Sequence, residues 1–191
     1  MTADTRERLV TAGVQLFQRQ GLAATGIKQI LSEADAGFSS LYHHFPGGKD
    51  DLAAEVIRTA GAIYQQHVEA VWDQASDPVS AMTAIFKGAA TALEVSGYAD
   101  VCPVATVAME VASTNEPLRI ATAQVFTAWT EAAQSRLRRA GIGQGDARRL
   151  ASTIVGLLEG AFMLCRASKT TAPMLAAGQA AVVLVKAATE P

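Results

Sequence analysis

The segment from Gly37 to Leu52, with the sequence GFSSLYHHFPGGKDDL, constrains the fold more than any other part of the chain. Its first half places Leu41, Tyr42 and Phe45 on one side of a short helix and polar side chains on the other. Pro46 ends this helix, because its ring clashes with a continuing helix and restricts the residue before it. A helix this short buries little area, so we expect it to be docked on a scaffold, with its polar face free to contact a partner.

The scaffold is predicted directly upstream. Asp4 to Gln20 carries apolar residues at helical spacing, and Asp4 followed by Glu7 forms a capping-box pattern. Gly21 supplies a C-terminal stop, and a second helix is expected from Ile27 to Ala34. Two helices joined by a short turn can present the second one to the major groove of DNA, although many small helical domains share this arrangement.

The remainder of the chain favours an all-α protein of about nine helices. Of the 191 residues 50% are hydrophobic and 6% are aromatic, and strand-like alternation is absent from the sequence. Asp77-Pro78 predicts an N-cap followed by a helix, and Gly141-x-Gly143-x-Gly145 predicts a turn between helices. We expect a helix-turn-helix domain at residues 1–48 and a helical bundle at residues 49–191.

The charge balance does not point to strong non-specific DNA binding. The whole chain has a formal net charge of −2, and acidic and basic residues balance within the first fifty positions. Affinity for DNA then has to come from a few placed contacts and from dimerisation. The N-terminus has no apolar signal segment, and no apolar run approaches the ~20 residues of a membrane span. We therefore expect a cytoplasmic protein with no membrane contact.

The stretch from Gly21 to Leu52 resembles the DNA-binding domain of TetR-family transcriptional regulators. The positions that carry the resemblance are Gly21, Thr25, Ile27, Ile30, Ala34, the string LYHHF at 41–45, Lys49 and Leu52. The turn from Pro46 to Lys49 and the segment from Cys102 to Ala108 are similar to the LmrA/YxaF-like subgroup. Phe38 departs from the lysine that this subgroup often has, so the operator sequence of relatives cannot be transferred.

This resemblance implies binding of double-stranded DNA at a palindromic operator. The expected DNA-contacting residues are Thr25, Lys28, Phe38, Ser39, Ser40, Tyr42, His43, His44 and Lys49. The hydroxyl of Thr25 and the N-terminus of its helix are expected to meet a phosphate, as are Tyr42, His44 and Lys49. Ser39, Ser40 and His43 are expected to read bases. Phe38 either contacts a thymine methyl group or packs against the scaffold.

The resemblance also implies a homodimer and a small hydrophobic or aromatic effector that releases a repressor from DNA. The dimer interface is predicted at Ile154, Val155, Leu158, Phe162, Leu175, Val182 and Val183 on the last two helices. The effector pocket is predicted from periodicity at Tyr64, His67, Phe86, Val104, Met109, Phe126, Trp129, Phe162 and Met163. Taken alone, each of these nine side chains fits plain core better than a ligand contact.

Other classes of function find less support. The sequence has no nucleophile elbow, phosphate-binding loop or HExxH motif, so we expect neither an enzyme nor a cofactor or metal site. His43 and His44 are neighbours about 100° apart around a helix, which does not suit one metal ion. The alternative is a ligand-binding or redox-sensing protein, with a role for Cys102, whose DNA-binding head has been repurposed.

Overall fold

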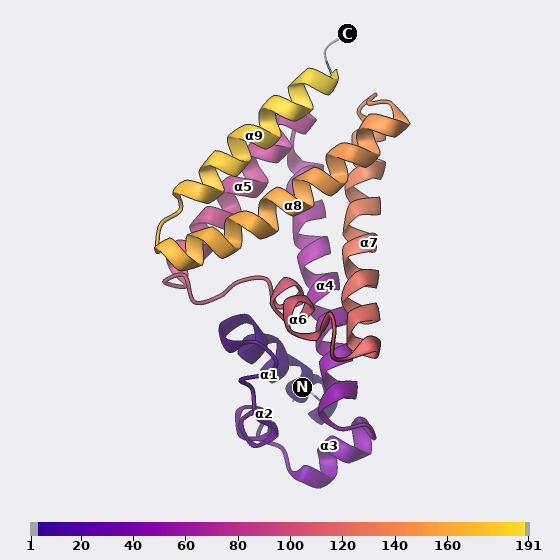
Figure 1. Ribbon diagram of the computed structural model, residues 1–191, viewed down its shortest axis with the longest axis vertical. Coiled ribbons are helices and arrows are strands. Elements are labelled where there is room, and N and C mark those ends of the chain that lie inside the picture. The colour runs from indigo at the N-terminus through magenta and orange to yellow at the C-terminus, as the bar shows by residue number, and fades with distance from the viewer. Residues whose placement is uncertain (1–3, 190–191) are drawn as a thin grey trace. The chain divides into compact units, whose positions relative to one another are not determined.

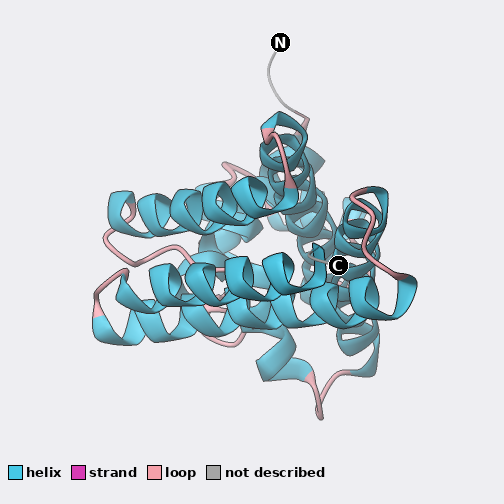
Figure 2. Cartoon of the chain, turned by 90° about the horizontal axis from the view of Figure 1, so that it is seen from above, coloured by secondary structure: helices cyan, strands magenta, loops and turns pink. Residues whose placement is uncertain are grey.

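The computed structural model describes residues 4–189, and every regular element in that range is a helix (Figures 1 and 2). The helices are α1 (Thr5–Gln20), α2 (Ile27–Glu33), α3 (Phe38–His44), α4 (Lys49–Gln74), α5 (Pro78–Val95), α6 (Pro103–Val111), α7 (Glu116–Arg139), α8 (Gln144–Ser168) and α9 (Ala172–Thr189). Nine helices and no strand in the described residues confirm the predicted all-α fold.

Contacts along the chain group these helices into two compact units. The first unit comprises residues 1–63 and 102–125, and the second comprises residues 64–101 and 126–191. Helices α1, α2, α3 and α6 belong to the first unit and α5, α8 and α9 to the second, while α4 and α7 contribute to both. The functional boundary expected between residues 48 and 49 coincides with the start of α4 and remains a prediction.

The first unit is built around α1. Leu9 and Phe17 of α1 are completely buried, and Gly13 lets α1 approach α4 so closely that a Cβ atom there would lie 2.5 Å from Cγ2 of Val56. The guanidinium of Arg6 lies 5.5 Å from the centroid of the Phe45 ring. These contacts give α2 and α3 the scaffold that such short helices require.

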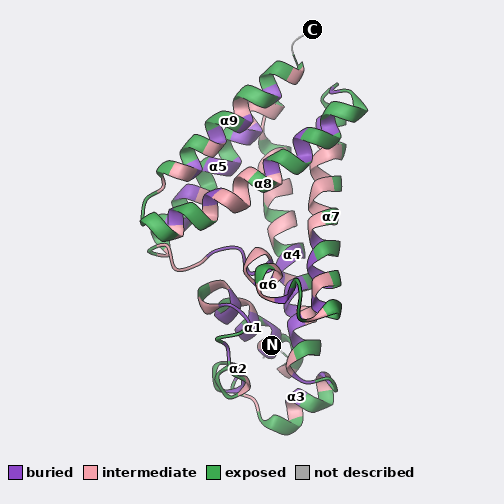
Figure 3. Ribbon diagram, in the orientation of Figure 1, coloured by how far each residue is buried: buried purple, intermediate pink, exposed green. Residues whose placement is uncertain are grey.

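The second unit packs α9 against both α5 and α8. Figure 3 shows buried residues on the facing sides of these three helices and exposed residues on the outer side of α9. Gly178 of α9 is buried against Phe86 of α5, where an added Cβ atom would lie 2.7 Å from the Cβ atom of Phe86. Arg136 of α7 forms ion pairs with Glu69 at 3.2 Å and Asp73 at 3.1 Å on α4.

The two predicted helix starts have different outcomes. Asp77 caps α5 as expected, because its carboxylate accepts hydrogen bonds from the N–H groups of Val79 at 2.8 Å and Ser80 at 2.9 Å. These bonds, that from the Ser80 N–H above all, lower the pKa of Asp77 below its ordinary value. Asp4 occupies the N-cap of α1, but its side chain makes no capping hydrogen bond, so the capping box predicted with Glu7 is wrong.

Two helices, α8 and α9, are long and apolar enough to cross a membrane by length and composition alone. This corrects the expectation that no apolar stretch approaches that length. Only 28% and 22% of their most apolar windows are buried within this chain. Composition of this kind also fits helices whose outer faces meet another protein surface.

Candidate nucleic-acid interface

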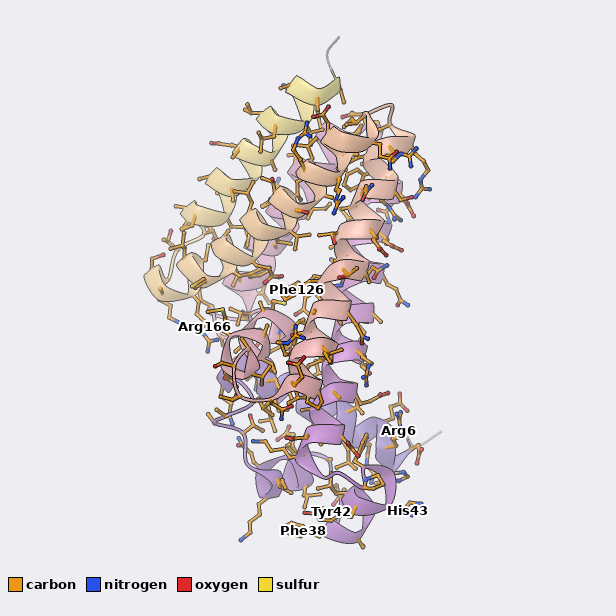
Figure 4. All side chains as sticks on the ribbon, turned by 45° about the vertical axis from the view of Figure 1, so that its right-hand side comes forward. Arg6, Phe38, Tyr42, His43, Phe126 and Arg166 are labelled. Carbon is orange, nitrogen blue, oxygen red and sulfur yellow. The ribbon has the colours of Figure 1, made fainter. Side chains whose placement is uncertain are left out.

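The two sides of α3 differ sharply in exposure. Leu41 and Phe45 are 1% and 4% exposed and fix the helix to the first unit, whereas Tyr42, expected on the same side of the helix, does not share their burial. Phe38 and Tyr42 are 49% and 51% exposed, and Ser39 and His43 are exposed as well. Figure 4 shows Phe38, Tyr42 and His43 projecting from α3. The short helix therefore carries a free face of the kind that enters a groove of DNA.

The turn after α3 brings Tyr42 towards the start of α4. Gly48 has a φ of +69°, which favours glycine, and carbon Cε1 of Tyr42 lies 3.2 Å from where a Cβ atom of Gly48 would be. The next residue, Lys49, donates a hydrogen bond from Nζ to the backbone oxygen of Leu22 at 2.7 Å. Because an ammonium group has three donors, Lys49 keeps two of them for another acceptor.

Thr25 does not present its hydroxyl to the outside. The side chain is completely buried, and its Oγ1 donates a hydrogen bond to the backbone oxygen of Gly21 at 2.6 Å. Gln20 adds a hydrogen bond from Nε2 to the same hydroxyl at 3.1 Å. The phosphate contact predicted for this hydroxyl is therefore corrected to a structural role, in which Thr25 holds the turn between α1 and α2.

Lys28 lies on the exposed side of α2, as the sequence predicted. Its neighbour Gln29 is held by Gln20, whose Nε2 donates to Oε1 of Gln29 at 2.8 Å. The side chain of Lys28 is thus the cation that α2 offers to a phosphate or a base edge. Ser40 and His44 are half-buried.

Two further side chains position this surface through contacts that the sequence does not predict. Arg8 donates from Nε to the backbone oxygen of Ala34 at 2.9 Å and from a terminal nitrogen to that of Asp35 at 3.1 Å. Glu110 of α6 accepts a hydrogen bond at 2.8 Å from the backbone N–H of Ala23, between α1 and α2. Both contacts join residues far apart in the sequence, so no local pattern signals them.

Comparisons with known proteins agree with this geometry. Residues 9–56 match the family described as bacterial regulatory proteins, tetR family, and residues 78–180 match the C-terminal domain of LmrA/YxaF-like transcriptional regulators. The chain belongs to the TetR family. It is a helix-turn-helix transcriptional regulator, and the repurposed alternative is not favoured.

Individual relatives of this TetR-family chain extend over nearly its whole length. The uncharacterised HTH-type transcriptional regulator YxaF of Bacillus subtilis is 34% identical over 183 residues, which cover 96% of each chain. The HTH-type transcriptional regulator LmrA of the same organism is 30% identical and covers 90% of this chain and 92% of its own. A TetR regulatory protein from Rhodobacter sphaeroides shares the fold, with a TM-score of 0.83, 20% identity and coverage of 93% and 97%.

The predicted effector-binding residues fall into distinct environments. His67, Met109 and Met163 are exposed, Met109 by 82%, while Val104 is buried in the first unit and Phe86 in the core of the second. The half-buried residues are Tyr64, Phe126, Trp129 and Phe162, all in the second unit. The rings of Phe126 and Trp129 meet edge to face with centroids 5.5 Å apart.

A hollow of about 490 Å³ lies elsewhere, on the surface of α7. It is lined by Glu131, Gln134, Ser135, Arg138 and Arg139. None of the predicted effector-binding residues lines it. Because all five lining residues come from one helix, this hollow does not enclose a ligand as effector pockets do.

The residues predicted at the dimer interface differ in their exposure. Ile154 is 6% exposed and belongs to the core of the second unit, so little of its side chain is left for a partner. Val155, Leu158, Phe162 and Val182 are half-buried, whereas Leu175 and Val183 are exposed. Met163, Leu164 and Leu184 add exposed apolar area on the same two helices. Gly156 and Gly160 have open space where a Cβ atom would lie.

Proposed function

We propose that this TetR-family regulator is a repressor that binds a palindromic operator as a homodimer and leaves it when a small hydrophobic or aromatic effector binds. The observation that carries the proposal is the free face of α3, formed by Phe38, Ser39, Tyr42 and His43, above the buried anchors Leu41 and Phe45. A short helix with this division is suited to lie in the major groove.

Phosphate contacts are assigned to the margins of this face. Tyr42 and Lys49 lie on either side of Gly48, and Lys28 extends from the exposed side of α2. His44 is the fourth candidate at the C-terminal end of α3. Because these contacts are few and the net charge is −2, we expect modest affinity for each half-site and a strong dependence on dimerisation.

The apolar outer face of α8 and α9 is the proposed dimer interface. Val183 and Met163 are each 65% exposed, and Gly156 and Gly160 leave space for the close approach of a second helix. A second copy of the chain would cover this surface in a closed two-fold dimer, which presents two reading helices to the two halves of a palindrome. This assignment also accounts for the apolar composition of both helices without a membrane, in a protein that acts on DNA in the cytoplasm.

The effector site is assigned to the half-buried aromatic residues of the second unit, Tyr64, Phe126, Trp129 and Phe162. Aromatic side chains suit a flat apolar ligand, and Tyr64 adds a hydroxyl. Effector binding has to favour the state that does not bind DNA, typically by ~1–3 kcal/mol. Because helices α4 and α7 contribute residues to both units, we assign the coupling to these two helices.

The proposal is tested by selecting bound duplexes from a randomised library with the full-length protein. The expected result is an enriched inverted repeat, and footprinting should show two protected major-groove segments on it. A screen of small aromatic compounds for release of that duplex then tests the effector site, with Trp129→Ala as the variant expected to lose release while keeping DNA binding. Absence of any enriched sequence would contradict the proposal.

A further inference from the structure

We propose that the ring of Phe38 contacts the C5-methyl group of a thymine, and that thymine methyl groups supply the main sequence information that α3 takes from its operator. This inference rests on the proposed function, because it names the base feature read by the same helix. It is based on the large apolar side chain of Phe38, which is 49% exposed on the free face of a seven-residue helix.

Phe38 does not anchor α3 to the scaffold. The anchoring of α3 is accomplished by Leu41 and Phe45, which are almost completely buried, and by Arg6 over the Phe45 ring. Phe38 precedes these anchors and retains about half of its surface in solvent. Packing against the scaffold, the second of the two roles expected from the sequence, therefore does not explain its position.

Helix α3 lacks the side chains that usually form base-specific hydrogen bonds. Its sequence, FSSLYHH, contains no Arg, Lys, Asn, Gln, Asp or Glu. Arg and Lys are the usual partners of guanine, Asn and Gln pair bidentately with adenine, and Glu or Asp accepts from cytosine. Serine and histidine make single hydrogen bonds that several bases can satisfy. Apolar contact with the methyl group of thymine is then the discriminating interaction left to this helix.

The rings of Phe38 and Tyr42 differ in their surroundings. Residues four apart lie on the same face of a helix, so both rings project on one side of α3 (Figure 4). The Tyr42 ring, however, lies against Gly48, with Cε1 at 3.2 Å and its hydroxyl at 3.8 Å from the Cβ position there. This places Tyr42 against the turn that precedes Lys49 in the chain. Phe38 is the large apolar side chain of α3 that remains for a base edge.

The experiment removes the methyl group alone. A duplex selected by the wild-type protein is synthesised with each thymine replaced in turn by uracil, which changes only the C5 substituent. At one symmetric position the replacement should weaken binding about fourfold per half-site, the effect of one buried methyl group, and roughly fifteenfold when both half-sites are changed. Other thymines should give no comparable change.

Two variants connect this effect to Phe38. Phe38→Ala should bind the thymine and uracil duplexes equally, whereas Phe38→Leu, which keeps an apolar side chain, should retain the preference for thymine. Thermal melting of both variants checks that α3 remains folded. Equal binding of all uracil duplexes by wild-type protein that still rejects a scrambled duplex would overturn the role of Phe38 and leave the proposed function standing. Failure to select any duplex would overturn both.

Discussion

The carboxylate of Glu110 on α6 accepts a hydrogen bond from the backbone N–H of Ala23, 87 residues earlier in the chain, at 2.8 Å. From α4, Lys49 donates to the preceding carbonyl group, that of Leu22, at 2.7 Å. Helices α4 and α6, which both follow α3 in the chain, thus hold the turn between α1 and α2. The position of this turn sets where α2 begins, and α1 contacts both α2 and α3.

Removing the Glu110 carboxylate should loosen this turn without unfolding the protein. For Glu110→Ala we expect amide exchange at Ala23 to become about five- to tenfold faster, since the lost hydrogen bond contributes roughly 1 kcal/mol. Operator affinity should fall severalfold in the same variant. Hydrogen exchange with residue resolution measures the first effect. Glu110→Gln retains an acceptor and serves as the control, and unchanged exchange at Ala23 in Glu110→Ala would refute the contact.

Lys49 should make a salt-dependent contribution to DNA binding. Replacing it with methionine keeps the length of the side chain and removes the charge, so the slope of log K against log salt should become shallower by about 0.9 for each lost phosphate contact, or ~1.8 for a dimer. Binding isotherms between low and moderate salt give this slope. Lys87→Met, on the exposed side of α5 and away from the proposed dimer interface, is the charge-matched control. Equal slopes for wild type and Lys49→Met would exclude a phosphate contact.

The dimer assignment predicts a different response at two exposed valines. Val183 on α9 is 65% exposed and Val95 at the end of α5 is 85% exposed, so glutamate at either position should leave the fold of one chain intact. Val183→Glu should yield monomers by light scattering and weaken operator binding on the order of a hundredfold, because the two half-sites are no longer linked. Val95→Glu should remain dimeric. A dimeric Val183→Glu protein would move the interface elsewhere.

Asp77 should stabilise the protein in a pH-dependent manner. Hydrogen bonds from the Ser80 N–H and neighbouring groups lower its pKa from the ordinary value of 3.8. The folded state therefore prefers the ionised carboxylate, and this stabilisation is present above pH 3.8 and lost as the pH falls through the lowered pKa. Asp77→Ala should melt at a lower temperature than wild type at neutral pH.

The acid limb of the same experiment separates the charge from the cap. The difference in melting temperature between wild type and Asp77→Ala should shrink as the pH approaches the folded-state pKa. The difference between Asp77→Asn and Asp77→Ala should not change over this range, because asparagine caps the helix without titrating. A constant difference across that range would mean that the carboxylate does not contribute through its ionisation.

Features encoded by neighbouring residues could be predicted from the sequence. The boundaries of α3, its anchors Leu41 and Phe45, and the cap at Asp77 all depend on short stretches whose spacing and turn residues are visible directly. Thr25 shows the limit. Its position at the start of α2 predicts a hydroxyl that is available to a phosphate. In the structure this hydroxyl instead donates its hydrogen bond to the backbone oxygen of Gly21.

Tertiary contacts limited the remaining predictions. Helical periodicity identifies one face of α6 or α8 but not which neighbour covers it. It therefore assigns Met109 and Met163 to the effector pocket, although both side chains are exposed. Ile154 shows the reverse error, because periodicity predicts it at the dimer interface whereas its side chain lies in the core. The contact of Glu110 with Ala23 spans 87 residues and depends on the fold itself, which single-sequence patterns do not encode.

The most direct measurement is fluorescence anisotropy of the purified protein on duplexes from the region upstream of its own gene, with a scrambled duplex as control, at several salt concentrations. We predict tight binding to one upstream duplex, weakening with salt, and the loss of this binding in Tyr42→Ala and Lys49→Ala. Equal and feeble binding of the upstream and scrambled duplexes, together with the absence of any duplex selected from a random library, would contradict the claim that the free face of α3 reads DNA.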